Sequence, residues 1–197
     1  MTPKNASPAL FARLSFGGPR ALWSDLAVVA LLIGLDAAAR LLPHAPNFTP
    51  VAASALFAAS VLRARALVLL VPIVGLLLGD IVHGFYDWRI MAAVYGALAL
   101  PAAAAWLPQR LRRPRLILPA LLGSSLAFYV LTNFAVWAFT PMYTPDLGGL
   151  ITCYVAALPF LKYTIGGDLT WAAILFGGYW LTQSLLDVRR GVVVSVG

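Results

Sequence analysis

The sequence predicts an all-α integral membrane bundle of about six transmembrane helices. Apolar residues make up 61% of the chain and charged residues only 11%, against about 25% charged residues in ordinary globular domains. Apolar runs of about 20 residues, the length that an α-helix needs to cross a bilayer, recur along the chain. The bilayer is therefore the expected solvent. We attribute the net charge of +7 to cytoplasmic loops rather than to a nucleic-acid partner.

Six apolar segments account for the predicted bundle. They are residues 22–42, 49–62, 66–85, 90–107, 116–138 and 163–186. Residues 49–62 are short for a span and are followed by Arg63 and Arg65. They either cross with the help of snorkelling arginine side chains and a locally thinned bilayer, or do not cross fully. A further short apolar segment, residues 149–161, ends at Lys162 and is predicted to be re-entrant or interfacial.

The distribution of Lys and Arg predicts that both termini are cytoplasmic. With six spans, eleven of the 14 Lys and Arg residues fall on the cytoplasmic side. If residues 49–62 do not span and the N-terminus lies outside, that number falls to nine. Positive residues are in excess in cytoplasmic loops, so six spans are preferred. The predicted organisation is a cytoplasmic tail (1–21), a membrane domain (22–186) and a second cytoplasmic tail (187–197).

The first span carries two features at helical spacing. Asp36 and Arg40 are four residues apart with the acid first, which favours an ion pair on one helix face. Ala30, Gly34 and Ala38 also recur every four residues and form a stripe of small residues, the kind of surface on which membrane helices pack closely. The stripe is either a packing face for a partner helix or a consequence of the alanine-rich composition.

The segment from Arg40 to Pro50 must turn, because Pro43, Pro46 and Pro50 remove backbone donors and push the preceding residues out of helical geometry. The turn also contains polar side chains, among them Asn47. Two interpretations are open. The segment is an ordinary loop between membrane helices, or it is a shaped lip over a binding site.

Polar and ionisable residues at membrane depth are candidates for function, because burying them in a bilayer is costly. Under both topologies the helix ends that carry Asp80, Asn133 and Asp168 face outward. Asp168 could instead cap a helix, and Trp137 could be an anchor at the membrane interface. The residues predicted to bind a substrate are Asn47, Asp80, His83, Asn133, Trp137 and Asp168.

No motif in the sequence indicates an enzyme or a cofactor. The nucleophile elbow, the HExxH zinc motif, the P-loop and the dinucleotide fingerprint are all missing, and the chain has no glutamate. His44 and His83 with Asp80 match no recognised metal spacing. We therefore expect no cofactor, no metal and no catalytic residues. A membrane enzyme with a bare pair of aspartates, or a His–Asp site, is kept as a third alternative.

Several motifs, in order along the chain, resemble the signature of a family of small bacterial multi-pass membrane proteins of unassigned function. The motifs are PNFTP (46–50), TNFAVW (132–137), CYVAALPF (153–160) and GGD (166–168). The resemblance covers residues 31–181 and implies a location in the bacterial inner membrane.

The family is itself similar, in size and six-helix layout, to the S components of energy-coupling-factor (ECF) vitamin transporters. This similarity implies that the protein captures a small, vitamin-like solute in an outward-facing pocket and takes it up. The first helices would then pack on a partner through small residues. Because the chain has no ATP-binding motif, coupling to ATP would need separate membrane or ATPase subunits. The alternative is a non-enzymatic assembly or scaffold subunit without a ligand.

Overall fold

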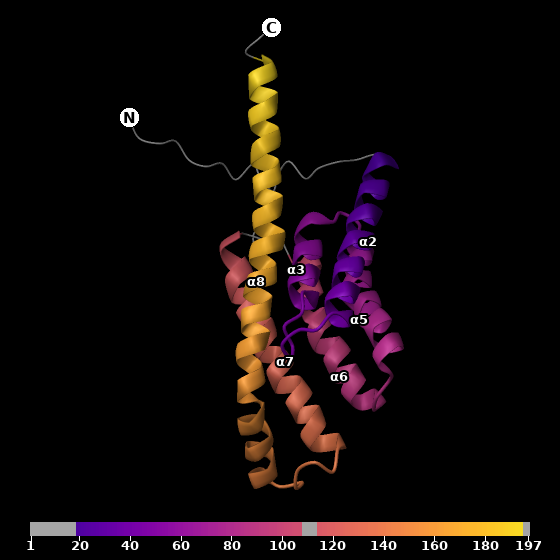
Figure 1. Ribbon diagram of the computed structural model, residues 1–197, viewed down its shortest axis with the longest axis vertical. Helices are drawn as coiled ribbons and strands as arrows, with labels where there is room; N and C mark the ends of the chain where they lie inside the picture. Colours follow the sequence, from indigo (N-terminus) through magenta and orange to yellow (C-terminus); the bar gives the residue numbers. More distant parts are fainter. Residues whose placement is uncertain (1–18, 108–113, 195–197) are drawn as a thin grey trace, which may run out of the picture.

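The computed structural model describes residues 19–107 and 114–194, and this part of the chain contains helices but no strand (Figure 1). The predicted all-α class is confirmed. The elements are α2 (Pro19–Leu41), α3 (Val51–Val61), α4 (Arg65–Val68), α5 (Leu70–His83), α6 (Trp88–Ala99), the 3-10 helices η1 (Leu100–Trp106) and η3 (Pro114–Leu116), α7 (Ile117–Phe139) and α8 (Leu147–Val194). The predicted N-terminal tail lies outside the described residues, except for its last three residues, which begin α2.

Five helical segments in the described residues are long and apolar enough to cross a membrane, which makes this a multi-pass membrane protein. They are Leu22–Leu41, Arg65–His83, Trp88–Trp106, Pro114–Phe139 and Leu147–Val188. They correspond to the first, third, fourth, fifth and last predicted spans. The second predicted span is the short helix α3 of 11 residues. At 1.5 Å per residue α3 is about 16 Å long, roughly half the thickness of the hydrocarbon core. A full crossing by α3 and the side on which the termini lie remain predictions.

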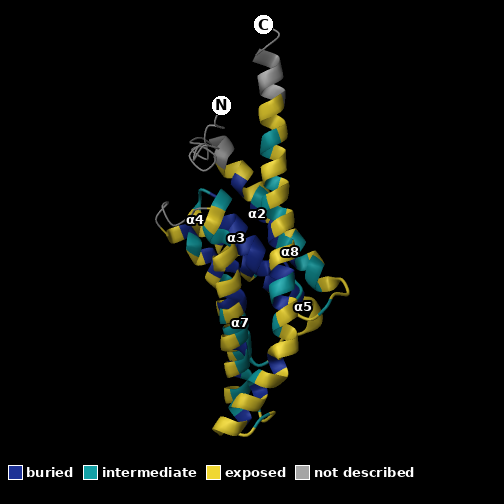
Figure 2. Cartoon of the chain, turned by 90° about the vertical axis from the view of Figure 1, so that its left-hand side faces the viewer, coloured by how far each residue is buried: buried dark blue, intermediate teal, exposed yellow. Residues whose placement is uncertain are grey.

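The short helix α3 forms the centre of the bundle. Its first nine residues are all buried, and the helix packs against η1, α8, α5 and α7. Figure 2 shows this helix as the dark blue core between exposed outer helices. Alanine and serine dominate its sequence, and small side chains of this kind let membrane helices approach closely. A helix enclosed by protein can satisfy its surroundings without contacting lipid along its length, so 11 residues are compatible with this central position.

The prediction of a separate re-entrant or interfacial segment at residues 149–161 is wrong. That segment and the last predicted span form one continuous helix of 48 residues, α8, which passes through Pro159. Membrane helices tolerate proline because neighbouring groups compensate for the lost hydrogen bond. Lys162 does not end the helix either. Its charged side chain is exposed and lies over the ring of Tyr163, with Nζ 4.9 Å from the ring centroid, so its charge does not have to be buried within the helix bundle. The helix also includes residues 187–194 of the predicted C-terminal tail.

Helices α2 and α5 pack closely because α5 presents glycines to the polar side chains of α2. A Cβ atom added at Gly75 would lie 2.7 Å from the Cβ of Asp36, and one added at Gly79 would overlap the side chain of Arg40. The predicted stripe of small residues on α2 points elsewhere. Its three residues, Ala30, Gly34 and Ala38, are exposed, and a Cβ added at Gly34 would meet no atom within 4 Å. Whether a partner helix packs there remains a prediction.

Asp146 organises the start of α8 from just before its first residue. Its Oδ1 accepts hydrogen bonds from the backbone N–H of Gly149 at 2.7 Å and from the hydroxyl of Thr144 at 3.1 Å. The bond from Gly149 is the main reason why the pKa of Asp146 lies below its ordinary value, and the bond from Thr144 adds to it. Asp146 therefore stabilises the helix start mainly as a carboxylate.

We expect Asp146→Ala to destabilise the α7–α8 hairpin in a manner that depends on pH. Because the folded-state pKa is lowered, the contribution of Asp146 is fully present above the ordinary pKa of aspartate, about 4, and is lost as the pH falls through the folded-state value. Hydrogen exchange of the first turn of α8 should be faster in the variant at pH 7, and the difference from wild type should shrink in acid. An equal difference at both pH values would contradict this role.

Candidate functional site

A cavity of about 390 Å³ lies where the segment 42–50 meets the ends of α2 and α5 and the sides of α6, α7 and α8. Its walls combine eight polar side chains with three apolar ones. The lining residues are Arg40, His44, Asn47, Thr49, His83, Tyr86, Val94, Leu98, Phe128, Thr164 and Asp168. Three of the predicted substrate-binding residues, Asn47, His83 and Asp168, therefore come together in one place.

The segment 42–50 forms one wall of this cavity, which agrees with the interpretation of a lip. Phe48 lies against α8, where a Cβ atom added at Gly167 would be 3.0 Å from its Cα. Asn47 has a positive φ of 60°, a conformation that asparagine adopts more readily than most residues. The backbone N–H of Phe48 and Nδ1 of His44 both donate to the carbonyl of Ala45, at 3.0 Å and 2.8 Å. These contacts fix the turn and hold His44 and Asn47 at the cavity.

A partly buried ion pair joins α2 to α5 beside the cavity. A terminal nitrogen of Arg40 lies 2.5 Å from Oδ1 of Asp80, whose side chain is only 3% exposed. Tyr95 on α6 donates its hydroxyl to Oδ2 of Asp80 at 2.8 Å. His83 donates Nε2–H to the backbone carbonyl of Arg40 at 2.9 Å. Asp80 itself does not line the cavity. Its ion pair holds the lining residue Arg40 in position.

The expected ion pair between Asp36 and Arg40 does not form, because Arg40 turns to Asp80. Asp36 is fully buried and accepts a hydrogen bond on Oδ1 from the hydroxyl of Ser54 on α3, at 2.8 Å. Its Oδ2 has no hydrogen-bond partner. Spacing along one helix favours the intrahelical pair, but the glycines of α5 bring Asp80 within reach of the guanidinium.

Asp168 is the acidic residue of the cavity wall. It is 4% exposed and accepts a hydrogen bond from the hydroxyl of Ser125 on α7, at 2.6 Å. It lies within α8, so the alternative in which it caps a helix start does not apply. One turn before it, Thr164 also lines the cavity and donates its hydroxyl to the carbonyl of Phe160 in its own helix. Asp168 therefore faces the cavity without an ion-pair partner among the described residues.

Three predicted substrate-binding residues, Asp80, Asn133 and Trp137, are not part of the cavity lining. Asn133 donates its side-chain amide to the carbonyl of Tyr129 in its own helix at 2.8 Å. Trp137 donates Nε1–H to the carbonyl of Thr144 at 3.0 Å and so fastens the loop after α7. The predicted substrate-binding residues did not include the lining residues Phe128 and Arg40, of which Arg40 was assigned to a pair on its own helix.

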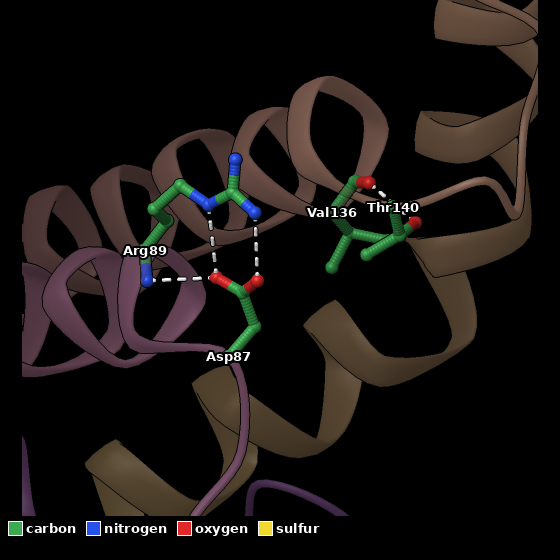
Figure 3. A network of polar contacts seen from close by, with 4 residues as sticks. All are labelled: Asp87, Arg89, Val136 and Thr140. Atoms are coloured by element: carbon green, nitrogen blue, oxygen red, sulfur yellow. Dashed lines mark hydrogen bonds and ion pairs between the residues drawn. The ribbon is translucent and has the colours of Figure 1, made fainter.

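An exposed pair stabilises the start of α6 at the same end of the bundle (Figure 3). Asp87 accepts the backbone N–H and Nε–H of Arg89 on Oδ1, and a terminal N–H of Arg89 on Oδ2. The side-chain bond from Arg89 is the main reason why the pKa of Asp87 lies below its ordinary value. The guanidinium carbon of Arg89 also lies 5.1 Å from the ring centroid of Phe139 at the end of α7. This pair is structural and lies apart from the cavity lining.

The cavity offers hydrogen-bonding and charged groups but no group of metal ligands. Among residues 19–107 and 114–194, no three His, Cys or Asp side chains come together to hold a metal ion. Burial raises the pKa of Tyr86, with a further contribution from the charge of Asp80, so its hydroxyl is a neutral donor at physiological pH. The arrangement is suited to holding a polar molecule by charge and hydrogen bonds.

The chain is 32% identical over 146 residues to the achromobactin transport system permease protein CbrC of Dickeya dadantii (strain 3937), an alignment that covers 68% of this chain and 40% of the relative. The chain thus spans about two fifths of the length of that relative. No solved structure matches this chain. A family model described as a family of unknown function (DUF6580) matches residues 20–189, so the chain belongs to this family.

Proposed function

We propose that this protein binds a small polar solute in the cavity at Arg40 and Asp168 and carries it into the cell across the inner membrane. The observation that carries the proposal is the cavity itself, because it brings groups of both charges together among membrane-spanning helices. Ionisable residues at membrane depth commonly mark substrate pathways. The similarity to a transport system permease protein supports a role in transport.

The size and the walls of the cavity suit a small, vitamin-like molecule. A volume of about 390 Å³ falls within the range of small-molecule sites. Arg40 can hold a carboxylate or another acceptor, and Asp168 can hold an amine or a hydroxyl. Val94, Leu98 and Phe128 add an apolar surface to the cavity wall. The proposed solute therefore carries an acceptor group and a donor group on a partly apolar frame.

The proposed entrance is on the outer side of the membrane. In Figure 1 α2 begins, and α8 ends, toward one end of the bundle, whereas α5 and α6 meet toward the other. The lining residues His83 and Tyr86 lie at this second end. Arg63, Arg65 and Arg115 lie at helix ends on the opposite side, which the positive-inside rule assigns to the cytoplasm.

Uptake against a gradient would need an energy source outside this chain. The sequence contains no P-loop, so we propose that a separate energising module, such as membrane and ATPase subunits, works with the protein. The protein itself acts as a non-enzymatic binding and transport subunit.

The test is the retention of a small molecule by the protein in lipid nanodiscs, measured by native mass spectrometry and by binding assays with a panel of small zwitterionic and hydroxylated compounds. Asp168→Asn keeps the size of the side chain but removes its charge. It should weaken solute binding at least tenfold, because a hydrogen bond to a charged group is worth about 1.5–3 kcal/mol. The control Asp187→Asn changes an exposed residue outside the cavity and should bind like wild type. A wild-type protein that binds no compound, or equal binding by Asp168→Asn, would contradict the proposal.

A second candidate function is an assembly subunit without a ligand. The exposed stripe at Ala30, Gly34 and Ala38 favours it, because no described part of this chain packs against Gly34. Gly34→Leu should then release a stoichiometric partner that co-purifies with wild type, while the cavity variant Asp168→Asn should leave that partner bound. Retention of the partner by Gly34→Leu would count against this candidate.

A further inference from the structure

Asp36 is a carboxyl group at membrane depth that no cation neutralises. It lies in the span Leu22–Leu41 and is 0% exposed. The hydroxyl of Ser54 is its sole hydrogen-bond donor among the described residues, and Oδ2 has none. On its other side lies Gly75, so close that a Cβ atom there would collide with the Asp36 side chain. An ionised carboxylate in such a place would be very costly.

The nearest cation along the helix, Arg40, is already paired. Its guanidinium contacts Asp80, which is 2% exposed and also accepts the hydroxyl of Tyr95. The three groups Asp36, Arg40 and Asp80 therefore comprise two carboxyl groups and one permanent cation. If both carboxyls were ionised the cluster would have a net negative charge in a low-dielectric interior. One bound proton makes it neutral.

The other groups around Asp36 do not change this balance. The elements that pack on α2 are α3, α4 and α5. Helix α3 carries no ionisable residue, and Arg65 on α4 is exposed. Besides Asp80, α5 contributes His83, whose Nε2–H donates to the backbone of Arg40 rather than to a carboxylate. No described Lys, Arg or His forms an ion pair with Asp36.

We propose that Asp36, Arg40 and Asp80 form an intramembrane proton-binding site, in which Asp36 holds one proton while Arg40 pairs with Asp80. The reaction is the addition of a proton from water to the Asp36 carboxylate, which gives a neutral carboxylic acid. Arg40 decides how many protons the site holds, because it can neutralise one carboxylate. Since Arg40 also lines the cavity, a molecule there that draws its guanidinium away from Asp80 leaves a second carboxyl to be protonated.

The site can be tested with the proton as the probe, independently of any solute. Infrared difference spectroscopy of the protein in nanodiscs detects the carbonyl stretch of protonated carboxylic acids during a pH titration. All spectra are recorded in an Asp168→Asn background, which removes the buried carboxyl group of the cavity wall. We expect one carboxylic acid band at neutral pH that is lost in Asp36→Asn and kept in the matched control Asp187→Asn. A band that is unchanged in Asp36→Asn would overturn the proposal.

Charge variants test whether Arg40 determines the number of protons that the site binds. Arg40→Gln removes the cation, so Asp36 and Asp80 should both be protonated and the band should roughly double. Asp80→Asn frees Arg40 to pair with Asp36, four residues earlier on the same helix, so the band should disappear. A band that persists in Asp80→Asn would show that Arg40 does not govern the site and would overturn the shared-cation arrangement.

The variant Ser54→Ala tests the assignment of the band to Asp36 without removing any charged group. The carbonyl oxygen of a protonated Asp36 would lose its hydrogen-bond donor, so the band should move to higher frequency without losing intensity. Helical content, measured by circular dichroism, verifies that each variant is folded. An unshifted band in folded Ser54→Ala would assign the protonated carboxyl to another residue and contradict the proposal.

Discussion

Replacing Arg40 with methionine is expected to lower the free energy of unfolding by about 3–5 kcal/mol, the usual cost of removing one partner of a buried ion pair. The reason is that Asp80 has a 3% exposed side chain and would keep only the hydroxyl of Tyr95 as a partner. Reversible unfolding in mixed detergent micelles would measure the loss. Solute binding should also be lost, because Arg40 lines the cavity.

A double variant separates the broken pair from the loss of the arginine stem. In R40M/D80N position 80 no longer carries a carboxyl group that must take up a proton or stay charged without a partner, while the amide oxygen can still accept from Tyr95. The double variant should therefore recover much of the stability that R40M loses, with a coupling energy of up to about 3 kcal/mol. If R40M and R40M/D80N were equally unstable, packing of the arginine stem rather than the ion pair would hold α2 on α5.

The second large effect is expected at Gly75. Alanine there should destabilise the protein by about 1–3 kcal/mol, the typical cost of adding a methyl group to a filled site. The new Cβ would lie 2.7 Å from the Cβ of Asp36, an atom next to the backbone that cannot swing away. Helices α2 and α5 would have to separate, and the contact between Arg40 and Asp80 would weaken with them. Unfolding in mixed micelles measures the change.

Gly34→Ala is the matched control, because it makes the same chemical change on the facing helix. No atom lies within 4 Å of the added Cβ, and alanine is the better helix former. This variant should be neutral or more stable by up to about 1 kcal/mol. The same sign of effect at both glycines would show that helix propensity, rather than the α2–α5 contact, dominates at Gly75.

The turn at 40–50 shows how far local chemistry can be followed. Its prolines indicate from the sequence that the chain must turn, because they keep the residues that precede them out of helical geometry. The sequence predicted Asn47 as a binding residue, but it could not show that His44 lies at the same cavity, because this depends on Phe48 packing against Gly167 on a helix more than 100 residues away. The proline geometry predicts the turn, but it does not predict which distant residues the turn contacts.

Asp36 and Arg40 show why a spacing rule failed. Four residues along a helix is a favourable separation for an ion pair, but it is worth only about 0.2–0.5 kcal/mol on an isolated helix. A buried contact with Asp80, made possible by Gly75 and Gly79 on α5, outweighs that preference. The continuity of α8 through Pro159 was missed for a related reason, since packing in a membrane can compensate for a lost hydrogen bond.

The sequence by itself determined that this protein is a helical membrane protein, because the bilayer requires long apolar segments whose backbone bonds are satisfied within each helix. It also identified the polar residues that are costly at membrane depth. Only the tertiary structure decided which of them meet. It gathers Asn47, His83 and Asp168 at one cavity and leaves Asp80, Asn133 and Trp137 outside its lining. The physical reason is that apolar periodicity sets which segments enter the membrane, whereas contacts between small residues set how the segments rotate against one another.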